Sequence, residues 1–258
     1  MQHGRRDHFS PQGYLRGFIH PSRTAVAKPL WVFSVPNRRW RQRSTSAFGW
    51  KDGLYDYPLG SDPDGTAEDE FLRPENDFPA IREKIRRGGF ATWAEHREDI
   101  VRFAAMLSSR SPVFLEQAAA SIAPSLGDRR DSQQLAHNYS VTVMRSEIPA
   151  RFKRWLALSW ALRFTTDPGA PVVGCDQSVG MDGYEPDISS ALGDDRTLLF
   201  FPISWDMCLF GSRATLTPEC AEFVEADLLR LRSFIVKQAR SFVVSPVRLD
   251  NIGSELTS

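Results

Sequence analysis

Apolar residues change their spacing along the chain, and these changes divide it into three parts. Residues 30–35 are rich in β-formers and precede a Pro-Asn turn, so the first part predicts a hairpin that reaches Trp40. Between residues 66 and 162 the apolar positions recur at helical spacing, which predicts a run of helices. From residue 163 onwards, short continuous apolar runs bounded by turn residues predict strands.

Proline and glycine set the expected limits of the central helices. The first helix is expected from about Ala67, with an interruption or a kink at Pro74, a continuation over 77–87 and an end at Gly88-Gly89. The other central helices are expected over residues 92–109, 113–122, 132–145 and 151–162.

The last part predicts strands in 163–177 and 196–212, a final strand at 241–246, and an amphipathic helix over 219–240. Neither end of the chain alone carries enough strands for a sheet. We therefore expect a single α+β domain in which a central run of helices lies against a small sheet built from N-terminal and C-terminal strands. Its regions are the N-terminal motif and hairpin (1–60), the helical region (66–162), the strands with the amphipathic helix (163–246), and a tail (247–258).

Composition adds limits on the class of protein. The chain is 41% hydrophobic and 11% aromatic, yet no apolar run approaches the roughly 18–20 residues that span a bilayer. We expect a cytoplasmic protein without membrane contact. The three cysteines are odd in number and widely spaced, which argues against a disulfide framework.

Charge is balanced overall, with 32 basic and 32 acidic residues, but it is unevenly distributed. Residues 1–43 contain nine Lys/Arg and one Asp, whereas residues 52–79 contain nine Asp/Glu and one Arg. Either the two segments neutralise each other, or the basic segment holds phosphates while the acidic one holds a metal. Nucleic-acid binding through the basic segment is a further alternative.

The common catalytic signatures are absent from the sequence. It has no G-x-S-x-G elbow, no G-x-x-x-x-G-K-[ST] loop, no G-x-G-x-x-G and no H-E-x-x-H, which disfavours the familiar hydrolases, NTPases and dehydrogenases. Scattered polar residues remain as candidates.

The irregular stretch "HFSPQGYLRGF" contains the first pair of candidates, His8 and Arg16. Histidine transfers protons near neutral pH, and arginine binds phosphate with its planar fork. The structural alternative is that His8 caps a turn and Arg16 pairs with a carboxylate.

Acidic residues supply the second group of candidates. Glu68 and Glu75 lie seven residues apart, a spacing that puts both carboxylates on one face of a continuous helix. Together with a histidine they would hold Mg²⁺ or Mn²⁺ and activate water; otherwise they belong to a solvated helix face. Thr166 and Asp167 follow a predicted strand, where either catalysis or ordinary turn chemistry places such residues.

These pieces together resemble an uncharacterised bacterial family, domain of unknown function 4238. The opening stretch followed by "LWVF" is similar to that family's H-[FY]-x-P-x-x-Y-L-x-x-F motif and the aromatic strand after it. Glu68 and Glu75 have the spacing of its paired glutamates, and Arg110-Ser111-Pro112 is similar to its R-T-P. The segments "TTDPGAPVV", "FPIS" and "KQARSFVVS" resemble its T-S-D-N-P-V-V, P-L-S-P and A-x-R-x-V-x-S. Gly13 departs from the pattern, because the family usually has an aromatic residue there.

The resemblance groups polar residues from distant segments, and we expect them to converge on one pocket. The leading hypothesis is a hydrolase or nuclease, metal-dependent in one version, that acts on a nucleotide or nucleic acid. The expected catalytic residues are His8, Glu68, Glu75 and Asp167, the expected metal ligands are Glu68, Glu75 and Asp167, and the expected substrate-binding residues are Arg16, Arg110 and Thr166. The alternative is a non-catalytic module of a toxin, immunity or phage-defence system, with a protein or small ligand as its partner.

Overall fold

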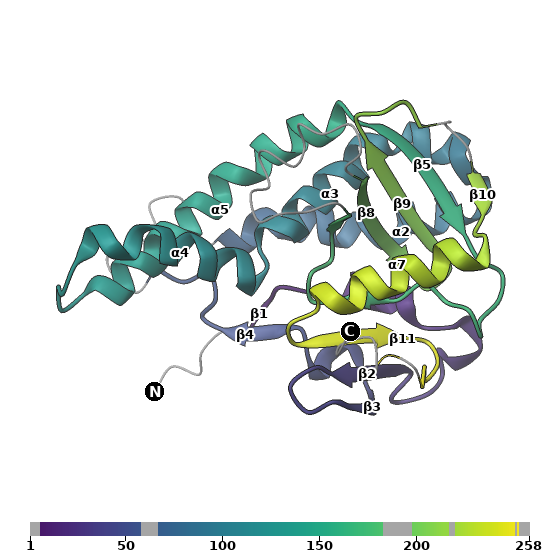
Figure 1. Ribbon diagram of the computed structural model, residues 1–258, viewed down its shortest axis with the longest axis horizontal. Coiled ribbons are helices and arrows are strands. Elements are labelled where there is room, and N and C mark those ends of the chain that lie inside the picture. Colours follow the sequence, from purple (N-terminus) through teal and green to yellow (C-terminus); the bar gives the residue numbers. More distant parts are fainter. Residues whose placement is uncertain (1–5, 58–66, 183–197, 217–219, 251, 253–258) are drawn as a thin grey trace.

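The computed structural model describes residues 6–57, 67–182, 198–216, 220–250 and 252, and within them the fold is mixed α+β (Figure 1). The described strands are β1 (Arg6–His8), β2 (Leu30–Ser34), β3 (Arg39–Arg43), β4 (Trp50–Asp52), β5 (Ser159–Phe164), β6 (Gly174–Cys175), β7 (Gly180–Asp182), β8 (Leu198–Ser204), β9 (Met207–Ser212), β10 (Cys220–Glu222) and β11 (Phe242–Ser245). The described α-helices are α1 (Gln12–Leu15), α2 (Ala67–Glu95), α3 (Arg97–Ser109), α4 (Pro112–Leu126), α5 (Ser132–Leu156) and α7 (Glu225–Gln238). Short 3-10 turns cover Arg16–Phe18, Pro21–Arg23 and Thr45–Ala47.

One sheet joins the two ends of the chain, as expected. Its strand order is β3-β2-β11-β6, and β11 pairs antiparallel with β2, so that Val244 lies opposite Val32. The predicted hairpin of residues 30–40 forms its β2–β3 edge. The last strand of the sequence therefore completes a sheet that the first hairpin begins.

A second sheet, larger than the first, differs from the expectation of one small sheet. Its order is β10-β5-β9-β8-β7, and all five strands come from the C-terminal part of the chain. The N-terminal strands β1 and β4 form a separate antiparallel pair. The prediction undercounted the C-terminal strands because it assigned residues 151–162 to a helix. It also began the last helix at residue 219, whereas Cys220–Glu222 form β10 and α7 begins at Glu225.

That assignment is wrong beyond Leu156, where α5 ends. Residues Ser159–Phe164 form β5, which pairs with β9 on one side and β10 on the other. Trp160 and Leu162 are buried there. A short apolar run has no period that separates a buried strand from a buried helix, so its neighbours in the fold decide the conformation.

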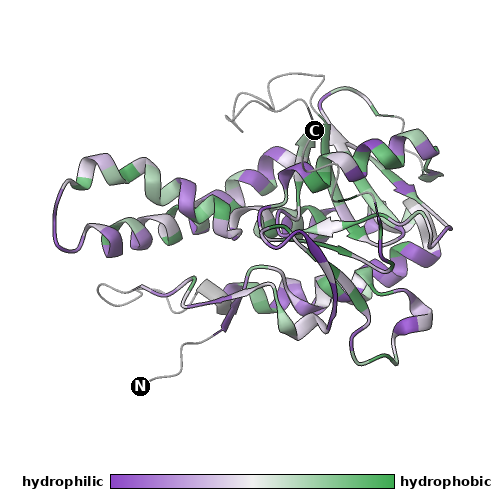
Figure 2. Cartoon of the chain, turned by 60° about the horizontal axis from the view of Figure 1, so that its bottom comes forward, coloured by the Kyte–Doolittle hydropathy of each residue, from purple (hydrophilic) through white to green (hydrophobic). Residues whose placement is uncertain are grey.

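Helices cover both faces of the five-stranded sheet (Figure 1). Along β8, Leu199, Phe201 and Ile203 pack into the core that α2 and α3 share, whereas Phe200 packs with the buried face of α7. This alternation follows from the two-residue repeat of a strand. Antiparallel helices α4 and α5 form a hairpin that projects from this body, with hydrophilic residues at its tip (Figure 2). No helix in the described ranges is long and apolar enough to cross a membrane.

Helix α2 continues through Pro74 and Pro79, so the predicted break at Pro74 is wrong. The buried side chains of Phe71, Phe78 and Ile85 recur every seven residues along its core face. Each such burial stabilises the fold by roughly 1.5–3 kcal/mol, so the three together offset a cost of the size that each internal proline carries, roughly 3 kcal/mol. The interruption occurs at the glycines instead, as predicted, where Gly89 has φ 63°. Helix α5 likewise continues through Pro149.

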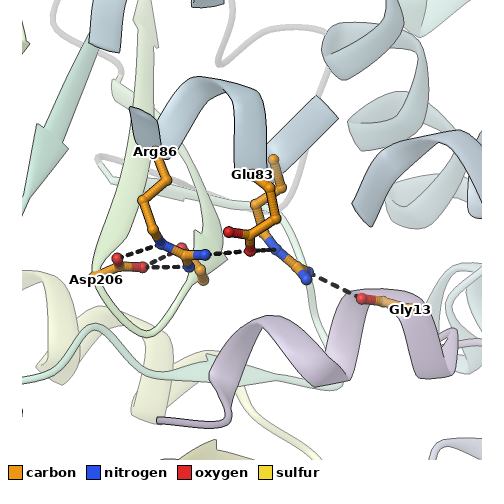
Figure 3. A network of polar contacts seen from close by, with 6 residues as sticks. Gly13, Glu83, Arg86 and Asp206 are labelled. Atoms are coloured by element: carbon orange, nitrogen blue, oxygen red, sulfur yellow. Dashed lines mark hydrogen bonds and ion pairs between the residues drawn. The ribbon is translucent and has the colours of Figure 1, made fainter. Parts of the chain in front are cut away.

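Polar contacts attach α2 to elements on either side of it (Figure 3). Arg82 donates a hydrogen bond of 2.9 Å to the carbonyl oxygen of Gly13 in α1. One turn later, the guanidinium of Arg86 donates two hydrogen bonds, of 2.7 and 2.9 Å, to the carboxylate of Asp206 in the β8–β9 turn. Helix α2 thus holds the opening motif against the five-stranded sheet.

Gly17 permits this close approach. A Cβ atom on Gly17 would lie 2.6 Å from Nη1 of Arg82 and 2.8 Å from the carbonyl oxygen of Ile203. A Cβ on Gly13 would meet less resistance, with Cγ of Pro79 at 3.1 Å. The two glycines of the opening motif therefore leave room for α2 and β8.

We expect Gly17→Ala to destabilise the protein by about 1–3 kcal/mol, because the added methyl group overpacks a filled interface. Gly13→Ala should cost less. Both positions are helical, so alanine would stabilise either one if no clash occurred. The free energy of unfolding, measured in urea for the two variants, tests this order. Equal stability of Gly17→Ala and the wild type would contradict the packing argument.

Candidate functional site

Pairing between β1 and β4 positions His8. In this antiparallel pair His8 lies opposite Trp50, and Asp7 lies opposite Lys51. Side chains alternate between the two faces, so Asp7 is buried while His8 is partly exposed. The Asp7 carboxylate accepts a hydrogen bond of 3.1 Å from the backbone N–H of Tyr55, which attaches the β1–β4 pair to the chain that follows it.

Beside this pair lies an arginine that is sealed from solvent. Arg110 follows the last residue of α3, and its side chain has no exposed surface. Its Nη1 donates to Oε1 of Glu75 on α2, and its Nε donates to the hydroxyl of Tyr55 at 3.2 Å. The same hydroxyl donates to the carbonyl oxygen of Arg110 at 3.0 Å, and the guanidinium lies 4.5 Å from the ring centre of Phe71. Among the described residues, Nη2 has no hydrogen-bond partner.

These contacts keep Arg110 charged. Burial by itself would lower the pKa of Arg110, but Tyr55 and Glu75 raise it above its ordinary value. A buried charge is tolerated only where it is paired and hydrogen-bonded, and Glu75 supplies that pairing. The Glu75 side chain keeps 20% of its surface exposed, so the pair sits at the edge of the core.

His8 lies within the field of this ion pair. Burial lowers the pKa of His8, Glu75 opposes that effect, and Arg110 adds to it. Smaller contributions come from the neighbouring Asp7, which raises the pKa, and Arg6, which lowers it. The net effect lowers the pKa of the imidazole below its ordinary value, which favours its neutral form near pH 7. A neutral, partly exposed imidazole can accept a proton from a bound molecule.

The structure thus brings together three of the sequence-predicted residues, His8, Glu75 and Arg110, and we call them with Tyr55 the His8 site. Arg16 is exposed, and its side chain donates a hydrogen bond of 3.5 Å to the side chain of Gln12 in α1.

The loop after β5 holds Thr166 and Asp167 in another place. The Thr166 hydroxyl donates to Glu222 at 3.0 Å, and the Asp167 carboxylate accepts from the N–H of Gly169 at 2.7 Å, which is ordinary Asx-turn chemistry. The preceding Thr165 contacts the backbone of Asp206, the partner of Arg86.

That neighbourhood is remote from Glu75. Arg86 lies eleven residues after Glu75 on α2, which corresponds to about 16 Å along a helix axis. The side chain of Glu68 lies outside the described residues. In the part of the chain that the structure describes, no three His, Cys, Asp or Glu side chains are grouped so that they could hold a metal ion. The Glu75 carboxylate is paired with Arg110 instead.

Three residues of this neighbourhood were not singled out from the sequence. The guanidinium of Arg6 lies 4.2 Å from the ring centre of Trp50, next to His8 on the same face of the β1–β4 pair. Tyr55 holds Arg110 and follows β4 by three residues. The alternation of Arg6, Asp7 and His8 hints at a strand, but only the register with β4 places Trp50 beside the histidine.

The molecule is therefore an α+β protein in which a partly exposed histidine lies beside a buried arginine–glutamate pair. The family described as "Protein of unknown function (DUF4238)" has a model that matches residues 6–246, and the chain belongs to this family. The resemblance seen in the opening motif is confirmed. No curated protein and no solved structure matches the chain.

We expect Glu75→Gln to destabilise the fold by about 3 kcal/mol, because the variant leaves the buried Arg110 without its counter-charge. The matched control on the same helix is Asp77→Asn, which breaks the exposed pair between Asp77 and Arg73 and should cost less than about 1 kcal/mol. Urea unfolding of both variants provides the comparison. Similar costs for the two would show that Arg110 does not depend on Glu75.

The imidazole of His8 should titrate below pH 6.5 in the folded protein, and Glu75→Gln should lower that pKa further by removing the charge that raises it. NMR titration of the ring signals, assigned with His8→Gln, measures both values. Because the folded pKa is the lower one, the unfolded chain binds the proton first. The stability of the wild type relative to His8→Gln should therefore fall as the pH drops from 6.5 through the folded pKa. An upward shift of the pKa in Glu75→Gln would contradict this electrostatic account.

Proposed function

We propose that the protein is a hydrolase that acts on a phosphate-containing substrate, a nucleotide or nucleic acid, at the His8 site. The observation that carries the proposal is His8 itself: a neutral, partly exposed imidazole between a carboxylate and two arginines. Such perturbed histidines concentrate at functional sites, since burial and neighbouring charges adapt them to proton transfer.

The charges around His8 favour a phosphate group. Arg6 and Arg110 both act on the imidazole from nearby, and Arg6 is exposed beside the half-buried ring of Trp50. An exposed guanidinium next to an aromatic ring can pair with a phosphate while the ring stacks on a base.

In the proposed reaction His8 acts first as a general base. It accepts a proton from the water that attacks phosphorus, so that a P–O bond to the water oxygen forms while the P–O bond to the leaving group breaks. The imidazolium then returns the proton to the departing oxygen, which restores neutral His8. Glu75 stabilises the intermediate imidazolium, because its charge raises the pKa of His8.

The roles assigned to other residues change in this proposal. Arg110 is a positioning residue, since a side chain without exposed surface sets the field around His8 rather than touching the substrate. Arg6 takes the phosphate-binding role expected of Arg16, which is bonded to Gln12 within α1. The metal-dependent version is the weaker one, because Glu75 is paired with Arg110 and Asp167 belongs to a separate turn.

A second candidate function is the non-catalytic binding module. The buried network of Arg110, Tyr55 and Glu75 favours it, because such a network has internal partners and needs no substrate to explain it. His8 and Arg16 argue against it, since neither is sealed from solvent.

Hydrolysis of bis(p-nitrophenyl) phosphate, p-nitrophenyl phosphate and a set of nucleotides tests the proposal. We expect turnover by the wild type in the presence of EDTA, and a loss of about 10²–10⁴-fold in kcat for His8→Asn. The matched control is His137→Asn on α5, which removes a histidine outside the His8 site and should keep the wild-type rate.

Three outcomes separate the alternatives. Wild-type activity in His8→Asn would remove the catalytic assignment. Activity that EDTA abolishes and Mn²⁺ or Mg²⁺ restores would favour the metal-dependent version. Absence of turnover on every substrate, combined with tight binding of one of them, would favour the binding module.

A further inference from the structure

A cleft of about 720 Å³ lies where α3, α4, α5 and α7 approach one another, and no residue of the His8 site lines it. Its walls come from the end of α3, the start of α4, the last turns of α5, the segment before β7 and the C-terminal end of α7. We call it the basic cleft. A volume of this size is typical of sites for small organic molecules.

Positive charge dominates the basic cleft. Arg151, Lys237 and Arg240 line it, and none of its described lining residues is acidic. The carboxylate of Glu147 is shared between Arg151 and Arg154, so it offsets only part of the charge of Arg151.

The carboxylate of Asp176 is held by backbone N–H groups. Its two carboxylate oxygens accept the backbone N–H groups of Arg240 and Ser241, each at 3.0 Å. These bonds fix the backbone of Arg240 at the rim of the cleft. A cleft with three cations and no lining acid attracts anions.

The basic cleft continues into a recess of about 80 Å³, which is lined by Arg151, Ser108, Ser111, Gln177 and Ser178 among others. That is the space of about two to three water molecules, and it suits one compact polar group.

Donors for such a group converge on the recess. The Arg151 side chain is 5% exposed, with Nη1 bonded to the Ser108 hydroxyl and the guanidinium 4.6 Å from the ring centre of Phe114. The amide nitrogen of Gln177 is buried and has no hydrogen-bond partner among the described residues. A buried donor without a partner is costly, and a bound acceptor would satisfy it.

We propose that the basic cleft binds a small phosphorylated molecule, with its phosphate group in the recess. Arg151 and the amide of Gln177 donate to the phosphate oxygens, and Lys237 and Arg240 neutralise the remaining charge from the rim. The apolar side chains of Met181 and Phe234 line the wider part and contact the organic portion of the ligand. This inference is independent of the hydrolase proposal, because the two sites share no residue.

Calorimetric titration with inorganic phosphate, pyrophosphate and AMP tests the basic cleft. We expect the wild type to bind at least one of these probes, and the double variant Lys237→Gln/Arg240→Gln to raise its Kd at least about tenfold. The matched control is Lys84→Gln/Lys153→Gln, which removes the same charge from two exposed positions outside the cleft and should stay within about twofold of the wild type. Arg151→Gln should weaken binding further, and the rim variant keeps the test valid if Arg151→Gln does not fold.

Several results would overturn the proposal. One is that the wild type binds none of the probes at millimolar concentration. Another is that the rim variant Lys237→Gln/Arg240→Gln and the control variant Lys84→Gln/Lys153→Gln raise the Kd equally, which would indicate general charge attraction. If citrate binds as tightly as phosphate and is weakened equally by the rim variant, the cleft is a site for carboxylates rather than for phosphates. If binding is lost in His8→Asn but retained in the rim variant, the ligand binds at the His8 site instead. If binding is retained in His8→Asn, it supports the cleft whether or not the protein hydrolyses the test substrates.

Discussion

A guanidinium with no exposed surface must be compensated inside the protein, and Arg110 imposes this condition on the whole His8 site. Its partners come from two segments that are distant in sequence: Glu75 on α2 and Tyr55 after β4. These contacts hold Tyr55 and Glu75 in place beside Arg110. The pair with Glu75 also explains why this glutamate does not serve as a free metal ligand, since its carboxylate already neutralises a buried charge.

Helix α2 connects the His8 site to the opening motif and to the five-stranded sheet. Glu75 faces Arg110 near its beginning, Arg82 holds the carbonyl of Gly13, and Arg86 holds Asp206 at the tip of the β8–β9 hairpin. The opening motif is therefore confined between α2 and the five-stranded sheet, and Gly17 supplies the space for it. The motif's diagnostic aromatic residues, Tyr14 among them, serve this packing, because the Tyr14 hydroxyl is buried and donates to the backbone of Pro202.

Sequence reasoning found three members of the site but could not find their setting. His8, Glu75 and Arg110 were singled out by residue type and motif order, and the fold brings them together. Asp167 was grouped with them because it follows a strand, yet its carboxylate closes its own turn near a different part of α2. Trp50 escaped notice because its place beside His8 depends on strand register, which local sequence does not encode strongly for a three-residue strand.

By itself the sequence determined the elements whose cause is local: the β2–β3 hairpin, the amphipathic helix α7, and the helix break at Gly89. Turn residues and apolar periodicity act over a few residues, so they can be seen in the sequence. Only the tertiary structure decided that α2 and α5 continue through their prolines, that residues 159–164 form a strand, and that the pKa of the His8 imidazole is lowered. These outcomes depend on burial and on charges supplied by distant segments, and both appear only when the chain is packed.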